Sequence, residues 1–148
     1  MYNKPKSSLE YSEPVIEQYS DNVVLEVMPQ KIDDDTSSKY VLIKHDYYSS
    51  DSDHGRELLS GFLDGLSESS FSSVVVYLID KGTKLLDETN PLHDSMLRLI
   101  EKSEMVIAAA DSISFYEVTY DSNSKIVEQS SRSIAEDIIY LPGLFVLE

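Results

Sequence analysis

The segment HDYYSSDSDH, residues 45–54, holds side chains that could ligate a divalent metal ion. Imidazole nitrogens and carboxylate oxygens are common ligands of such ions, and the candidates are His45, Asp51, Asp53 and His54. Residues 51–55, DSDHG, match only the opening of a calcium-binding loop. We favour a simpler interpretation, in which the loop is solvated and Asp53 forms the N-cap of a helix. We therefore expect no metal or other cofactor.

A second possible chemistry would use Ser112 as a nucleophile, with His45 or His93 as its base. Serine is common throughout the chain, however, and the GxSxG motif that would place such a serine on a sharp turn does not occur. A phosphate-binding loop is also disfavoured, because residues 82–84, GTK, lack the first glycine of a P-loop. The sequence thus favours a protein that is not an enzyme, without deciding the matter.

Five apolar segments separated by helical patterns would position these residues. The spacing of the connections is typical of crossovers between parallel strands. We predict a three-layer α/β/α sandwich around a mainly parallel, five-stranded sheet. The strands are expected near residues 40–45, 73–79, 104–110, 125–129 and 144–148.

Three helices are expected between these strands, each with its own start signal. Asp53 is the predicted N-cap of the first helix. Asn90 is the predicted cap of the second, with Pro91 in the first helical position. Ser133 and Glu136 have the spacing of a capping box in the third.

The most probable place for a site is the carboxyl edge of the sheet, where open parallel sheets bind their ligands. Three segments meet there, namely residues 45–53, 80–84 and 108–115. The candidate pocket residues are His45, Asp46, Lys84, Ala109, Asp111, Ser112 and Phe115.

Residues 1–38 differ in pattern from residues 39–148, which we expect to form the α/β domain. They are predicted to be an N-terminal arm with one short strand in NVVLEVMP, residues 22–29. We expect the arm to pack against another subunit, since aromatic anchors concentrate in interfaces. The candidate interface residues are Tyr11, Tyr19, Val24, Leu144 and Phe145.

Composition limits the partners and the compartment. The 148-residue chain has 12 basic and 27 acidic residues, for a net charge of −15. Such a field repels nucleic acid and anionic membranes, so neither is expected as a partner. No apolar run approaches the about 20 residues that span a bilayer, and the N-terminus lacks a signal-peptide pattern, so we expect a cytoplasmic protein. The absence of cysteine excludes disulfides and thiolate chemistry on this chain.

The order of the segments resembles the DsrE-like superfamily, in particular the C-terminal domain of the YedF-type, sulfurtransferase-like proteins of selenium metabolism. The similar stretches are VLIKHDYYSSDSDHGRELLSGFLDGLSE, SSVVVYLIDKGTKLLDE and MVIAAADSISFYEV, within residues 39–148. A Gly-x-Lys-Leu turn of that family is matched by Gly82, Lys84 and Leu85. Its aromatic pair is matched by Phe115 and Tyr116.

The chain departs from this family at the end of the third strand. Where the family has a Cys-Gly-x-Cys type of segment, this chain has Ala109 and Ser112. Relatives carry sulfur there as a cysteine persulfide, and a serine hydroxyl cannot replace a thiolate in that role. The resemblance therefore implies the fold, whereas the residues argue against the chemistry.

We expect a non-catalytic DsrE-like protein that forms homo-oligomers or joins a complex with another protein, as the resemblance implies. One alternative is an enzyme or ligand-binding protein that uses His45, Asp46 and Ser112 without cysteine. Another is an accessory subunit of a sulfur- or selenium-handling complex whose cysteines lie on a partner. Fold alone does not separate these classes.

Overall fold

The structure is a computed structural model that describes residues 38–70 and 73–148. The expectations for the N-terminal arm, including Tyr11, Tyr19 and Val24, fall outside the described residues.

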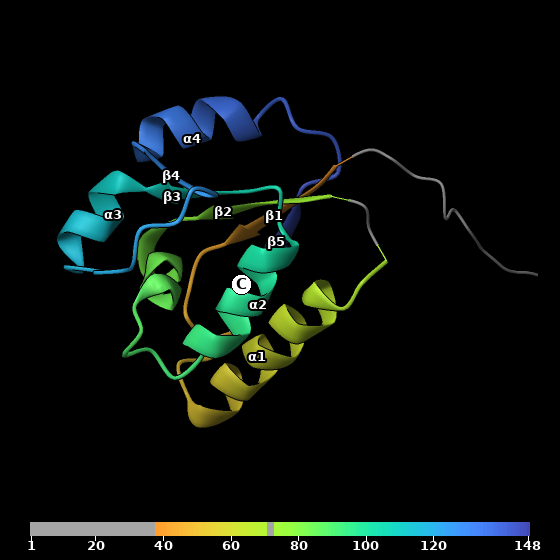
Figure 1. The fold of residues 1–148 in the computed structure, drawn as a ribbon, viewed down its shortest axis with the longest axis vertical. Coiled ribbons are helices and arrows are strands. Elements are labelled where there is room, and N and C mark those ends of the chain that lie inside the picture. The colour runs from red at the N-terminus through yellow and green to blue at the C-terminus, as the bar shows by residue number, and fades with distance from the viewer. Residues whose placement is uncertain (1–37, 71–72) are drawn as a thin grey trace, which may run out of the picture. The chain divides into compact units, whose positions relative to one another are not determined.

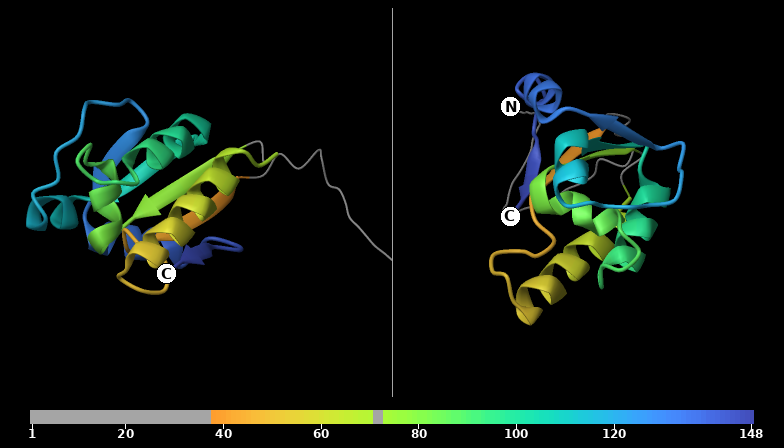
Figure 2. Two further views of the ribbon diagram at one scale, coloured as in Figure 1. Left: turned by 90° about the horizontal axis from the view of Figure 1, so that it is seen from below. Right: turned by 90° about the vertical axis from the view of Figure 1, so that its left-hand side faces the viewer.

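The sheet has five strands in the order β4-β3-β2-β1-β5, and every neighbouring pair is parallel. The predicted fold class is therefore confirmed. The central strand is β2, and β4 and β5 form the two edges (Figure 2). The strands are β1 Lys39–Ile43, β2 Val74–Leu78, β3 Met105–Ala109, β4 Ile126–Gln129 and β5 Phe145–Leu147.

One register row crosses the whole sheet. It runs from Ile126 through Val106, Val76 and Val41 to Phe145. Paired residues of parallel strands point to the same face, so this row presents apolar side chains to one helix layer. Its three central valines are at most 1% exposed, whereas Phe145 at the edge is 47% exposed.

Helices cover both faces of the sheet (Figure 1). α1 and α2 lie on one side and α4 lies on the other, while the short helices η2 and α3 follow the carboxyl ends of β2 and β3. The helices are α1 Asp53–Ser67, η2 Asp80–Leu86, α2 His93–Lys102, α3 Ala110–Phe115 and α4 Ser131–Ile138.

α1 forms because its apolar residues recur on one helical face. Leu59 and Leu63, four residues apart, are both fully buried against the sheet. Burial of each leucine side chain stabilises the fold by about 1.5–3 kcal/mol. Phe62 of the same helix is 37% exposed, and its ring packs on Tyr48 with centroids 4.7 Å apart.

The predicted helix starts need correction. Ser52, and not Asp53, caps α1, because its hydroxyl accepts the Gly55 N–H at 3.0 Å. Ser130 caps α4 by accepting the N–H of Ser133, so the predicted capping box does not form.

The start of α2 also differs from the prediction. Asn90 does accept a backbone N–H, that of Leu92 at 2.9 Å, but this bond closes a turn. The helix itself begins only at His93. Asparagine side chains commonly form such local turns, which compete with helix initiation.

The second face of the sheet has a smaller core. Leu42, Tyr77, Ile107 and Ala109 form it together with Ile134 of α4. A single helix covers this face, so only one α4 residue is fully buried.

No helix within residues 38–70 and 73–148 is long and apolar enough to cross a membrane.

Candidate functional site

Asp80 joins two of the three segments at the carboxyl edge of the sheet. It is the second residue after β2 and the first of η2, and it has a φ of 50°, a left-handed conformation that aspartate tolerates. Its backbone N–H donates to the Ser112 hydroxyl oxygen at 2.9 Å, and its carboxylate accepts the Tyr116 hydroxyl at 2.8 Å. The hydrogen bond to Asp80 raises the pKa of Tyr116 above its ordinary value. η2 and α3 are thereby held together.

Gly82 allows η2 to pass close over the end of β1. A Cβ atom at this position would lie 2.3 Å from the carbonyl oxygen of Ile43. The Gly82 N–H donates to the carbonyls of Lys44 and Ile79 at 3.2 and 2.9 Å. This close approach sets the position of the following turn, and with it that of Lys84.

Lys84 lies beside the aromatic pair that follows β3. Its amino group is 5.5 Å from the ring centroid of Tyr116, within the range of a cation–π contact. Phe115 packs edge-on against the Tyr116 ring, with centroids 4.9 Å apart, and is itself 77% exposed. Tyr116 is thus held between the lysine and the phenylalanine.

A shallow cavity of about 350 Å³ opens next to this contact. Asp46, Lys84 and Tyr116 line it together with Asp87 and Asn90. The amide nitrogen of Asn90 donates to Asp46 Oδ2 at 3.2 Å. The structure therefore brings Asp46 and Lys84 of the predicted pocket together.

Asp87 in this cavity is already engaged. Its Oδ1 accepts the Thr89 N–H and hydroxyl at 3.0 and 2.8 Å, and its Oδ2 accepts the Thr119 N–H at 3.3 Å. The bond from the Thr89 N–H is the main reason that the pKa of Asp87 lies below its ordinary value. This carboxylate therefore serves to join two loops.

The other predicted pocket residues are used inside the fold. Ala109 is fully buried in the core beneath α4. Asp111 accepts both the N–H and the hydroxyl of Ser131, at 3.0 and 2.9 Å. These bonds, the hydroxyl bond first, lower the pKa of Asp111. Asp111 thus anchors the first turn of α4 to the end of β3.

The histidines do not complete a Ser–His pair within the described residues. Ser112 makes no hydrogen bond to either His45 or His93 there. The ring of His45 stacks on Tyr47 with centroids 4.7 Å apart, and its buried Nδ1 has no hydrogen-bond partner among the described residues. His93 belongs to a separate cavity, described below.

The loop that suggested a metal site is organised around a cation of the protein itself. Arg56 contacts Asp51 and Asp53, both at 3.0 Å. The exposed His54 lies 3.8 Å from Glu57. Residues 38–70 and 73–148 contain no group of three or more potential ligands that could hold a metal ion.

Four residues of this edge were not predicted from the sequence, namely Tyr116, Asp87 and Asn90 as cavity residues and Asp80 as the residue that links the segments. Asp80 was detectable, since it directly follows the predicted strand at residues 73–79. Tyr116, Asp87 and Asn90 reach the edge of the sheet through turns. No local spacing in the sequence indicates that they lie near Lys84.

Comparisons with known proteins bear on the fold. No protein-family model matches the chain, and no curated protein matches its sequence. Among solved structures, the YchN protein from E. coli is similar with a TM-score of 0.50 and 12% identity, over 75% of this chain and 100% of that chain. A conserved protein of unknown function, BT1422 from Bacteroides thetaiotaomicron, has a TM-score of 0.49 and 12% identity, over 74% of this chain and 95% of that chain. At this identity the likeness to YchN shows a shared fold and nothing about activity.

Proposed function

We propose that this protein is a non-catalytic binding and assembly protein with a DsrE-like domain. The observation that carries the proposal is the role of the side chains at the end of β3, which are used inside the fold. Ala109 is packed in the core, Asp111 anchors α4, and the Ser112 oxygen accepts a bond from Asp80. In other proteins with parallel sheets, side chains at this position perform chemistry. In this chain they hold the domain together.

The DsrE-like assignment, with the YedF-type domain as the nearest pattern, rests on the order of the segments. It is supported by the contact between two of the matching motifs, because Lys84 of the Gly-x-Lys-Leu turn lies over Tyr116 of the aromatic pair. The all-parallel sheet agrees with the fold that this resemblance implies.

Self-association is supported by exposed apolar side chains between the end of α4 and β5. Ile139 is 70% exposed, Tyr140 83% and Phe145 47%. Large exposed apolar groups that follow each other closely often mark protein interfaces. Leu144, the other predicted contact of this region, is half-buried and packs on the core beneath α4, so we assign the contact to its three more exposed neighbours.

Size-exclusion chromatography with light scattering tests this association. We expect the mass to be a multiple of 16.7 kDa. Phe145→Lys should shift it toward the monomer, because a charge in a desolvated contact is costly. Val127→Lys is the matched control, since Val127 is 37% exposed on the opposite edge strand. A wild-type monomer at high micromolar concentration, or equal effects of the two variants, would contradict the proposal.

A second experiment tests the absence of sulfur-transfer chemistry. Incubation with a radiolabelled sulfur donor should leave the wild-type protein without covalent label, because the chain has no cysteine. Ser112→Cys supplies a thiol at the place where the family carries one and serves as the comparison. Stable label on the wild-type chain would falsify the proposal.

A further inference from the structure

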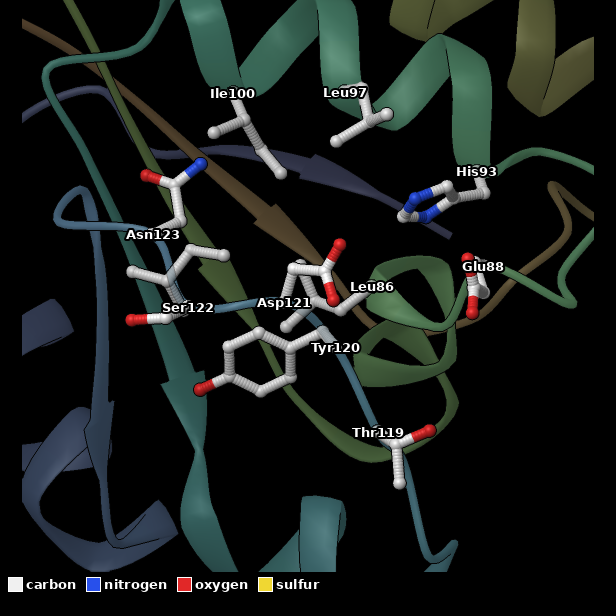
Figure 3. Close-up of a pocket in the computed structure, with 11 residues that line it drawn as sticks. Leu86, Glu88, His93, Leu97, Ile100, Thr119, Tyr120, Asp121, Ser122 and Asn123 are labelled. Atoms are coloured by element: carbon white, nitrogen blue, oxygen red, sulfur yellow. The ribbon is translucent and has the colours of Figure 1, made fainter.

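A second cavity, of about 210 Å³, lies between α2 and the segment that precedes β4 and shares no lining residue with the Asp46–Lys84 cavity (Figure 3). α2 contributes His93, Leu97 and Ile100 to it. The facing wall comes from residues 119–123, and Leu86 at the end of η2 closes the space between them. The cavity is thus assembled from three segments that are separate in the sequence.

One part of the cavity is apolar. Leu86 and Ile100 are at most 2% exposed, and Leu97 stands at the opening with 40% exposure. The Tyr120 ring lies opposite these side chains, and its hydroxyl donates to Glu128 Oε2 at 2.6 Å. Burial first, and then this bond, raise the pKa of Tyr120 to about 12. The phenol therefore stays neutral, and its ring is fixed as an apolar surface.

His93 supplies a directed hydrogen-bond acceptor to this space. Its Nδ1 lies 3.1 Å from the carbonyl oxygen of Leu85. A carbonyl oxygen only accepts, so this hydrogen bond requires a proton on Nδ1 and leaves Nε2 as the ring nitrogen that can accept. Figure 3 shows the ring reaching into the cavity below Leu97. No described residue hydrogen-bonds to Nε2.

Two carboxylates stand at the rim. Glu88 and Asp121 are exposed, and neither forms an ion pair or hydrogen bond with a described residue. No lysine or arginine is among the described residues that line the cavity. Together with the net charge of −15, this arrangement attracts cations and repels anions.

We propose that this cavity binds a small organic cation, a protonated amine carried on an aromatic or branched apolar body. The ammonium group has three N–H donors, which match His93 Nε2 and the two rim carboxylates. The apolar body fits between the α2 side chains and the Tyr120 ring. The volume corresponds to about seven water molecules at roughly 30 Å³ each, the size of one ring with a short amine arm.

Titration of the full chain with phenethylamine, followed by calorimetry or NMR, tests the proposal. Two probes of similar shape separate the contribution of the ligand's charge from that of its apolar burial. They are neutral 2-phenylethanol and anionic 3-phenylpropionate. We expect phenethylamine to bind about tenfold more tightly than the alcohol, and the carboxylate not to bind, because like charges at a rim exclude a ligand.

Variants locate the site. Glu88→Gln with Asp121→Asn should weaken phenethylamine binding about tenfold and leave binding of the alcohol unchanged, since only the charge contact is removed. Glu136→Gln with Asp137→Asn, on α4 at the other face of the sheet, makes the same change in net charge and should have no effect. Leu97→Trp should abolish binding of both probes by filling a half-open cavity without disturbing the core.

Three results would overturn the proposal. One is the absence of saturable binding of phenethylamine at millimolar concentration to the folded protein. Another is equal affinity for the amine and the alcohol. The third is equal weakening by the rim variant and the α4 variant, which would mean that the overall field attracts the amine without a defined site.

Discussion

The backbone N–H of Asp80 and the hydroxyl oxygen of Ser112 are joined by a hydrogen bond of 2.9 Å. This bond links the residue that follows β2 to the helix that follows β3. It occupies an acceptor site of the Ser112 hydroxyl, which the proposed DsrE-like resemblance aligns with a cysteine. The position is therefore part of the scaffold at the sheet edge.

Ser112→Ala should lower the free energy of unfolding by about 0.5–1.5 kcal/mol, because the Asp80 N–H loses its acceptor. Urea denaturation measures this difference. Ser114→Ala is the matched control, since the Ser114 hydroxyl is exposed on the same helix and has no partner among the described residues. Equal stability of the two variants would show that the bond contributes nothing.

Asp111 should make the stability of the domain depend on pH in the acid range. Its pKa in the folded state is lowered by the bonds from Ser131. The stabilisation is therefore fully present above the unfolded-state value of about 3.9, and it is lost as the pH falls through the folded-state value. Asp111→Asn should be less stable than the wild type at pH 7, and the difference should shrink in strong acid.

Urea titrations at both pH values test this prediction, with Asp137→Asn as the control. Asp137 lies on α4 like Ser131 but accepts no hydrogen bond through its carboxylate from a described residue. A stability difference for Asp111→Asn that does not change with pH would speak against the carboxylate as the source of the effect.

Gly82→Ala should destabilise the protein by about 1–3 kcal/mol, because the new Cβ would meet the backbone of β1. Gly61→Ala should have the opposite effect. No atom lies within 4 Å of a Cβ at that position in α1, and alanine favours a helix over glycine by about 0.4–1 kcal/mol. Thermal melts of the two variants should therefore move in opposite directions.

Ile134→Ala should lower the free energy of unfolding by about 2–5 kcal/mol, because Ile134 is the buried α4 residue of the smaller core. Ile139→Ala makes the same change at a side chain that is 70% exposed, and its effect on the monomer should stay within about 0.5 kcal/mol. Chemical denaturation at low protein concentration keeps association out of the comparison. Similar losses of unfolding free energy in the two variants would mean that α4 does not form a core with the sheet.

Deletion of residues 1–38 should lower the oligomeric mass, if residues 23–27 add a strand to an exposed sheet edge of another subunit. These residues lie outside the described part, so their role stays a prediction. Deletion of residues 1–14 keeps that segment and is the control. If the protein without residues 1–38 keeps the oligomeric mass of the full-length protein but melts at a lower temperature, the arm packs on its own domain.

The sequence alone was enough to predict the architecture of the domain. Its five apolar segments and the lengths of their connections indicate a parallel sheet between helix layers, because both signals arise from local patterns along the chain. The short α3 was not predicted, since six residues contain too little periodicity to indicate a helix.

The tertiary structure decided what the individual side chains do. The burial of Ala109 under Ile134 and the contact of Lys84 with Tyr116 both depend on which segments meet. The cavity that we propose to bind an amine is the clearest case, because its lining residues His93, Tyr120 and Leu86 come from three separate segments. Distances between such residues arise only when the sheet and its helices pack, and no local spacing in the sequence encodes them.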